Sequence, residues 1–119
     1  MILIVDDDAN FAEHCSMLLT GYGYEVQVAG SGHQALDRIG FQTLDLLISD
    51  CSMPGMDGIE LSRRVRALVT TCMAPILLMS GSRESDLGGC GSYDAFMRKP
   101  FLAEELLHKV RTLVPNYTH

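Results

Sequence analysis

Long hydrophobic runs are missing from this 119-residue sequence. No apolar stretch approaches the ~20 residues that a membrane-spanning helix needs. The apolar opening from Met1 to Val5 is short and leads directly into three aspartates, which is unlike a signal peptide. The sequence therefore predicts a soluble, cytoplasmic protein that makes no contact with a membrane.

Basic residues are also scarce. Nine lysines and arginines stand against fifteen aspartates and glutamates, which gives a formal net charge of −6. Domains that bind nucleic acid usually carry clustered positive charge. The one basic cluster, Arg63, Arg64 and Arg66, is interpreted as the solvated face of a helix. We therefore expect no nucleic-acid partner for this domain.

The four cysteines form no recognisable pattern. They are Cys15, Cys51, Cys72 and Cys90, and none belongs to a C-x-x-C pair. Their spacing relative to the four histidines fits no zinc site. We interpret them as small apolar side chains in a reducing compartment.

Internal repeats, low-complexity tracts and linkers are absent as well. Hydrophobic residues make up 47% of the chain and charged residues 20%, a composition that excludes a disordered chain. A mass of 13.1 kDa suits one domain and leaves no length for a second. The prediction is a single domain over residues 1–119 without an effector domain.

Short apolar runs alternate with longer segments of helical periodicity. Strands are predicted at Ile2 to Val5, Glu25 to Val28, Leu44 to Ser49, Pro75 to Met79 and Ala95 to Met97. The first, third and fourth runs are apolar enough for burial on both faces, whereas the second and fifth are short or alternating and belong at the edges. This pattern predicts an α/β, flavodoxin-like, doubly wound (βα)5 sandwich of three layers with a parallel sheet in the order 2-1-3-4-5.

Helix-capping residues precede three of the predicted helices. Asp8 and Asp57 are interpreted as N-caps, and Ser31 with Gln34 as a capping box. The helix after Asp57 is predicted to bury four apolar residues, Leu61, Val65, Leu68 and Val69. Glycine is frequent between Gly81 and Ser92, so the fourth helix is expected to be short or irregular.

Reactive polar residues follow the strands at one edge of this sheet, where ligands bind in parallel α/β folds. Those after strands one, three, four and five are, in that order, Asp6 to Asp8, Asp50, Ser80 and Lys99. Grouped carboxylates repel one another and need a cation or a raised pKa. Oxygen ligands suit Mg²⁺, and Mn²⁺ can substitute. The sequence predicts a site that holds a phosphoryl group between a metal, a hydroxyl and an ammonium, beside a carboxylate nucleophile.

The motifs at these positions resemble those of the response-regulator receiver domains of two-component signalling, which are CheY-like. They are Ile4-Val5-Asp6-Asp7-Asp8, the segment 49–58, Met79-Ser80-Gly81 and Lys99-Pro100-Phe101. The most specific is the aspartate that precedes Met53-Pro54-Gly55-Met56-Asp57-Gly58. The resemblance covers nearly the whole chain.

This resemblance implies a phosphoacceptor signalling switch and not an enzyme. Asp50 would accept a phosphoryl group from the phosphohistidine of a sensor histidine kinase or a histidine phosphotransfer protein. Asp6, Asp7, Asp50 and the backbone carbonyl of Ser52 would hold Mg²⁺. The chain would assist its own phosphorylation and dephosphorylation without turning over a free substrate.

Ser80 and Phe96 are implied to be the switch residues. Ser80 would move its hydroxyl onto the phosphoryl group, with Lys99 as the ion partner, and Lys99-Pro100 would be cis. Serine stands where threonine is commoner in the family, and Phe96 where tyrosine often stands, so no hydroxyl is available at that ring. The family's usual partner surface, formed by the fourth helix, fifth strand and fifth helix, is the expected site of an output partner and of phosphorylation-dependent dimerisation.

Two other functions stay open. A pseudo-receiver of the same fold would bind a partner without being phosphorylated, although the carboxylates, hydroxyl and lysine of the site are all present. An aspartate-nucleophile phosphohydrolase would use Asp6 and Asp8, but Asn10 stands where such enzymes have Thr or Val.

Overall fold

The computed structural model describes residues 1–87 and 92–117. Its strands are β1 (Ile2–Val5), β2 (Val26–Ala29), β3 (Leu46–Asp50), β4 (Ile76–Ser80) and β5 (Ala95–Arg98). Its helices, within these residues, are α1 (Ala9–Gly21), α2 (Gly32–Ile39), α3 (Gly58–Ala67), α4 (Ala103–Leu113) and the short 3-10 helix η1 (Glu84–Leu87). The predicted alternation of strands and helices is confirmed.

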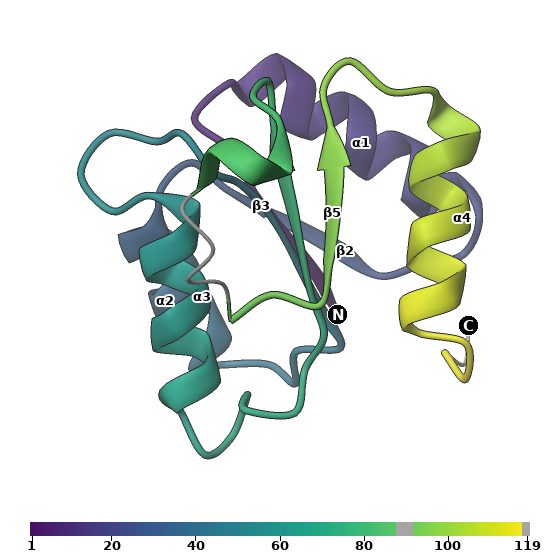
Figure 1. Cartoon of the computed structure of the whole chain (residues 1–119). Coiled ribbons are helices and arrows are strands. Elements are labelled where there is room, and N and C mark those ends of the chain that lie inside the picture. Colours follow the sequence, from purple (N-terminus) through teal and green to yellow (C-terminus); the bar gives the residue numbers. More distant parts are fainter. Residues whose placement is uncertain (88–91, 118–119) are drawn as a thin grey trace.

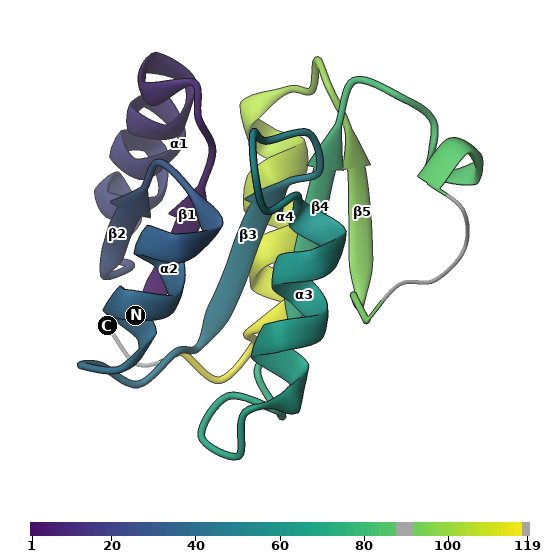
Figure 2. The same cartoon turned by 90° about the vertical axis from the view of Figure 1, so that its left-hand side faces the viewer.

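The strands form one parallel sheet in the predicted order, β2-β1-β3-β4-β5. In the register of the central strands, Ile4 lies opposite Val28 on one side and Ile48 on the other. Helices α2 and α3 cover one face of the sheet and α1 and α4 the other, which gives three layers (Figures 1 and 2). All strands therefore end at the same edge.

Two apolar cores lie on the two faces, because side chains alternate across a strand. The α2–α3 core contains Leu3 and Val5, whereas the α1–α4 core contains Ile2 and Ile4. Strands β1, β3 and β4 are buried throughout, whereas β2 and β5 are partly exposed. The expected division into central and edge strands is confirmed.

The predicted N-caps are confirmed. Asp8 accepts a hydrogen bond from the backbone N–H of Phe11 at 3.1 Å, and Asp57 accepts one from Glu60 at 2.8 Å. Ser31 caps α2 in the same way, but the Gln34 side chain accepts from the N–H of Gly30 instead of closing the box at Ser31. The predicted helix starts are therefore correct, but only the Ser31 half of the predicted capping box is formed.

The predicted apolar face of α3 is wrong at its end. The helix stops at Ala67, and Leu68 and Val69 are exposed by 42% and 91%. The buried hydroxyl of Thr71 donates to the carbonyl of Val65 at 2.7 Å, which satisfies the carboxyl end of the helix while the chain turns towards β4.

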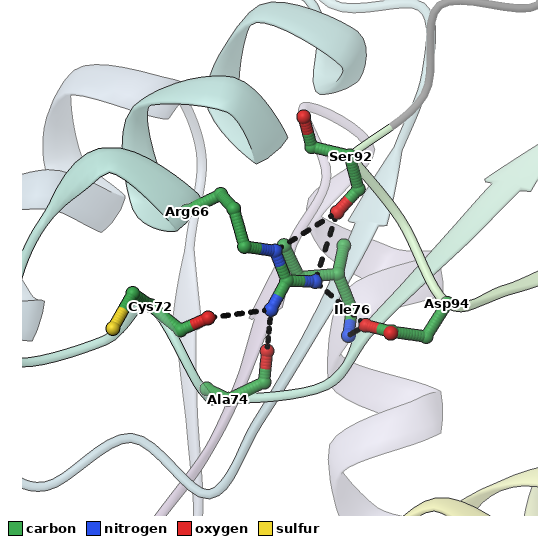
Figure 3. A network of polar contacts seen from close by, with 6 residues as sticks. All are labelled: Arg66, Cys72, Ala74, Ile76, Ser92 and Asp94. Atoms are coloured by element: carbon green, nitrogen blue, oxygen red, sulfur yellow. Dashed lines mark hydrogen bonds and ion pairs between the residues drawn. The ribbon is translucent and has the colours of Figure 1, made fainter.

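The interpretation of the arginines needs a correction too. Arg63 and Arg64 lie on the solvated face of α3, and Arg64 pairs with Glu60 at 3.4 Å. Arg66 does not belong to this solvated face, because its guanidinium contacts the loop after α3 and the segment at the start of β5 (Figure 3).

The segment before β5 contains η1 in place of a regular fourth helix, as predicted for the described part. The glycines at 88, 89 and 91 and Cys90 lie outside the described residues. The Lys99-Pro100 bond is cis, which confirms the prediction. Within residues 1–87 and 92–117, none of the helices has the length and apolar character that a membrane crossing requires.

Candidate functional site

Three carboxylates meet at the carboxyl edge of the sheet. Asp6 and Asp7 follow β1 directly, and Asp50 is the last residue of the neighbouring strand β3. One oxygen from each of the three lies within 4.8 Å of the others. Asp6 and Asp50 are 1% and 7% exposed, whereas Asp7 is open to solvent. The predicted juxtaposition is present.

Asp6 is held from three directions. Its backbone N–H donates to the carbonyl of Ala29 at 3.1 Å. Its Oδ1 accepts from the N–H of Asp8 at 2.9 Å, and its Oδ2 accepts from Lys99 Nζ at 2.9 Å. These contacts fix the orientation of a buried carboxylate next to Asp50.

Lys99 brings positive charge to both buried carboxylates. Its Nζ lies 2.9 Å from Asp6 Oδ2 and 3.4 Å from Asp50 Oδ1. The ammonium also sits over the ring of Phe11, 4.2 Å from its centroid, and Phe11 packs edge-on against Phe101. The contact between Phe11 and Lys99 was not predicted from the sequence, because the two residues lie 88 positions apart.

Burial and charge shift the pKa values of this group. Burial raises the pKa of Asp50, Asp6 and Asp7 raise it further, and Lys99 opposes the shift. For Lys99, burial alone lowers the pKa, but the hydrogen bond and charge of Asp6, together with Asp50, more than offset it and leave the pKa raised. Lys99 therefore stays protonated and positively charged.

The two predicted switch residues lie on the neighbouring strands β4 and β5. Ser80 is buried at the end of β4, where its Oγ accepts a hydrogen bond from the N–H of Ser82 at 3.0 Å. The N–H of Lys99 donates to the Ser80 carbonyl at 2.7 Å, which ties the two residues through the backbone. Phe96 on β5 is half-buried against the α2–α3 core.

The loop after β3 shapes the space around Asp50. Gly55 has a φ of 77°, which explains the glycine there, and Ser52 is exposed in the same loop. A Cβ on Gly58 would lie 2.3 Å from the carbonyl oxygen of Asp50. Gly58 is part of the motif that follows Asp50, but its close approach to the Asp50 carbonyl was not predicted, although a glycine at the first position of a helix is a weak helix former and could have signalled it.

The residues present suit a hard divalent cation. Carboxylate oxygens are the donors that Mg²⁺ prefers, and one exposed carboxylate beside two buried ones leaves room for bound water. Lys99 compensates part of the negative charge without being a ligand. The donor set thus fits Mg²⁺.

Comparisons with known proteins find relatives of this chain. The DNA-binding response regulator MtrA of Mycolicibacterium paratuberculosis is 36% identical over 113 residues, which are 92% of this chain and 49% of MtrA. The chain spans about half the length of the curated relatives it matches.

Solved structures extend the likeness to the fold. Chemotaxis protein CheY4 of Vibrio cholerae has a TM-score of 0.89 at 30% identity, over 94% of this chain and 96% of CheY4. Response regulator TrrA of Thermotoga maritima, in complex with Mg²⁺-BeF, has a TM-score of 0.83 at 34% identity, over 94% of this chain and 96% of TrrA. Residues 2–111 match the response regulator receiver domain, and the chain belongs to that family.

Proposed function

We propose that this receiver domain is a signalling switch in which Asp50 accepts a phosphoryl group. The supporting observation is the convergence of three carboxylates and one ammonium at the switch point of the sheet. Asp50 ends β3, which lies between β1, the strand that leads into Asp6 and Asp7, and β4, the strand that ends at Ser80. Its ionised oxygen is the nucleophile.

The transfer exchanges one bond to phosphorus for another. A carboxylate oxygen of Asp50 attacks the phosphorus of a phosphohistidine on a sensor histidine kinase or a histidine phosphotransfer protein. The P–N bond breaks, and its electron pair stays on the imidazole nitrogen, which takes up a proton. Water later hydrolyses the acyl phosphate to inorganic phosphate and the free carboxylate. The domain turns over no free substrate, so we regard it as a switch and not an enzyme.

Asp6, Asp7, Asp50 and the carbonyl of Ser52 would hold Mg²⁺, or Mn²⁺ in its place. When bound, the ion neutralises negative charge on the phosphoryl oxygens. The likeness to TrrA, which was solved with Mg²⁺-BeF, supports this assignment.

Ser80, Lys99 and Phe96 would read the phosphorylated state. The Ser80 hydroxyl leaves the N–H of Ser82 and donates to a phosphoryl oxygen, while the Lys99 ammonium turns from Asp6 towards the same group. The movement of Ser80 frees space along β4 and β5, and the half-buried ring of Phe96 swings further into the core.

The 119 residues would act as one receiver domain that regulates a partner or an attached output domain. The face formed by η1, β5 and α4 corresponds to the predicted partner surface, and we place phosphorylation-dependent dimerisation there. The net charge of −6 supports a domain that makes no nucleic-acid contact of its own. The free thiols of Cys15, Cys51 and Cys72 support a reducing, cytoplasmic setting.

Intact-mass spectrometry after incubation with acetyl phosphate and Mg²⁺ tests the proposal. We expect one phosphoryl adduct on the wild type, none on Asp50→Asn and none with EDTA. Asp57→Asn is the matched control, because it removes an exposed carboxylate outside the cluster. An adduct that survives in Asp50→Asn would identify a different nucleophile. No adduct on a wild type that demonstrably binds Mg²⁺ would favour the pseudo-receiver.

A further inference from the structure

Arg66, at the end of α3, uses all of its hydrogen-bond donors. Nη1 donates to the carbonyls of Cys72 and Ala74 at 2.8 and 3.0 Å. Nε and Nη2 donate to the carbonyl of Ser92 at 3.3 and 2.9 Å, and Nη2 also donates to Asp94 Oδ2 at 2.7 Å (Figure 3). A guanidinium has five N–H groups, so none is left over for solvent.

The partners of Arg66 come from both sides of β4. Cys72 and Ala74 lie in the segment that leads into β4, whereas Ser92 and Asp94 lie directly before β5. The same Asp94 Oδ2 accepts from the N–H of Ile76 at 2.8 Å, and the N–H of Asp94 donates to the carbonyl of Ile76 at 2.8 Å. The guanidinium therefore fixes the point at which β5 begins to pair with β4.

Strand β5, like β2, lies at an edge of the sheet. It is a four-residue edge strand that pairs only with β4 in the sheet. The described part of the segment that precedes it contains one short 3-10 helix. The start of β5 is held by the ion pair between Arg66 and Asp94.

The far end of β5 leads directly into Lys99, which belongs to the site. Lys99 lies five residues after Asp94, roughly 17 Å along an extended chain. Its ammonium is bound to Asp6 and Asp50, the contacts that phosphorylation would exchange. The contacts of Arg66 and Asp94 would hold the near end of β5 on β4 while Lys99 changes partners.

We propose that Arg66 is a positioning residue for the phosphoacceptor site, because it sets the register of β5 on β4 and so places Lys99 and Phe96. This inference rests on the function proposed above. Lysine cannot replace Arg66, since an ammonium has three donors and cannot reach three carbonyls and a carboxylate at once.

Arg66→Lys tests the proposal, and Arg64→Lys is its matched control on the exposed side of the same helix. Hydrogen exchange of the Lys99 amide, which bonds the carbonyl of Ser80, reports the register of β5. The rate of phosphorylation by acetyl phosphate at saturating Mg²⁺ reports the site. We expect Arg66→Lys to speed exchange in β5 and slow phosphorylation by about tenfold, with β1 and β3 unchanged, and Arg64→Lys to match the wild type.

A merely structural role predicts a different result. Arg66→Lys would then unfold more easily in urea, while the folded protein kept wild-type exchange at Lys99 and a wild-type phosphorylation rate, and this overturns the proposal. If Arg66→Lys does not fold, Asp94→Asn keeps an acceptor for Ile76 but removes the charge that faces Arg66. If the wild type takes up no phosphoryl group, the proposed function fails, and exchange in β5 alone decides whether Arg66 holds the strand.

Discussion

At the scale of single residues, the carbonyl of Asp50 is packed against a residue that has no side chain. Gly58 opens α3 so close to the end of β3 that an added Cβ would lie 2.3 Å from the Asp50 oxygen and 2.9 Å from the Cα of Cys51. Both are backbone atoms, which cannot rotate away. The position of Asp50, the proposed nucleophile, thus depends on glycine at 58.

Gly58→Ala is therefore expected to lower the free energy of unfolding by ~2–3 kcal/mol, because the new methyl group forces the backbone apart. Phosphorylation by acetyl phosphate is expected to slow as well, since Asp50 moves with the strand. Urea unfolding and intact-mass kinetics measure the two effects. Gly21→Ala is the control: nothing lies within 4 Å of its added Cβ, and a gain of ~0.4–1 kcal/mol is expected. Equal stabilities of the two variants would contradict this account.

Burial also sets the reactivity of Cys15, whose pKa it raises to about 11. From a starting value of 9.0, the shift lowers the thiolate fraction at pH 8 about 100-fold. Alkylation by iodoacetamide, mapped by peptide mass, is expected to label the partly exposed Cys72 first and Cys15 slowly, with about tenfold faster labelling per pH unit up to pH 11.

The same shift links Cys15 to stability. The folded state holds the thiol proton more tightly than the unfolded state, so this contribution is complete below pH 9 and is lost as the pH rises towards 11. Cys15→Ala is expected to flatten the alkaline decline of the unfolding free energy in that window. A decline as steep as that of the wild type would show that other groups cause it.

At the scale of elements, η1 is joined to the segment that leads into β5 by a side-chain hydrogen bond. Tyr93, just before β5, donates from its hydroxyl to Glu84 Oε2 at 2.8 Å, and this bond raises the pKa of Tyr93. The ring of Tyr93 packs on the α2–α3 core, as Phe96 does. Phe96 has no hydroxyl, but Tyr93, three residues earlier, has one and donates it to Glu84 in the segment that follows Ser80.

Tyr93→Phe is expected to loosen η1 without unfolding the domain. The bond is exposed, so the free energy of unfolding should fall by less than about 1 kcal/mol. Hydrogen exchange at the Asp86 amide, which bonds the carbonyl of Arg83, should become faster. Tyr22→Phe removes the hydroxyl of an exposed residue just after α1 and should leave this amide unchanged. Unchanged exchange at Asp86 in both variants would show that η1 does not depend on Tyr93.

Which elements could be predicted depended on whether their cause was local. Strand order followed from the distribution of apolar residues, and the meeting of Asp6, Asp50 and Lys99 followed from the order, because parallel strands end at one edge. The end of α3 could not be predicted in this way, because the apolar spacing continues into Leu68 and Val69 beyond the last helical turn. The partners of Arg66 lie up to 28 residues away, and no local pattern reports them.

At the scale of the whole molecule, the two apolar cores stabilise a sheet whose carboxyl edge opposes folding. The cores surround strands β1, β3 and β4 completely, and this burial is the main favourable contribution. At the edge, Asp50 is buried beside two further carboxylates, and Lys99 offsets only part of the cost, as the raised pKa of Asp50 shows. The fold therefore maintains an electrostatically unfavourable group of carboxylates, and we expect a bound cation to relieve the repulsion.

Asp50→Asn is accordingly expected to be more stable than the wild type in EDTA, by ~1–2 kcal/mol, because it removes a buried charge from the repelling group. Mg²⁺ should reverse the order. An ion at 100 times its dissociation constant stabilises the native state by about 2.7 kcal/mol, and the variant lacks one of the proposed ligands. Urea unfolding with and without Mg²⁺ measures both differences. Asp57→Asn provides the control, since asparagine caps α3 as well as aspartate does, and its stability should follow the wild type in both buffers. Lower stability of Asp50→Asn in EDTA would mean that the ion pair with Lys99 outweighs burial and repulsion, and that the site is favourable without a metal.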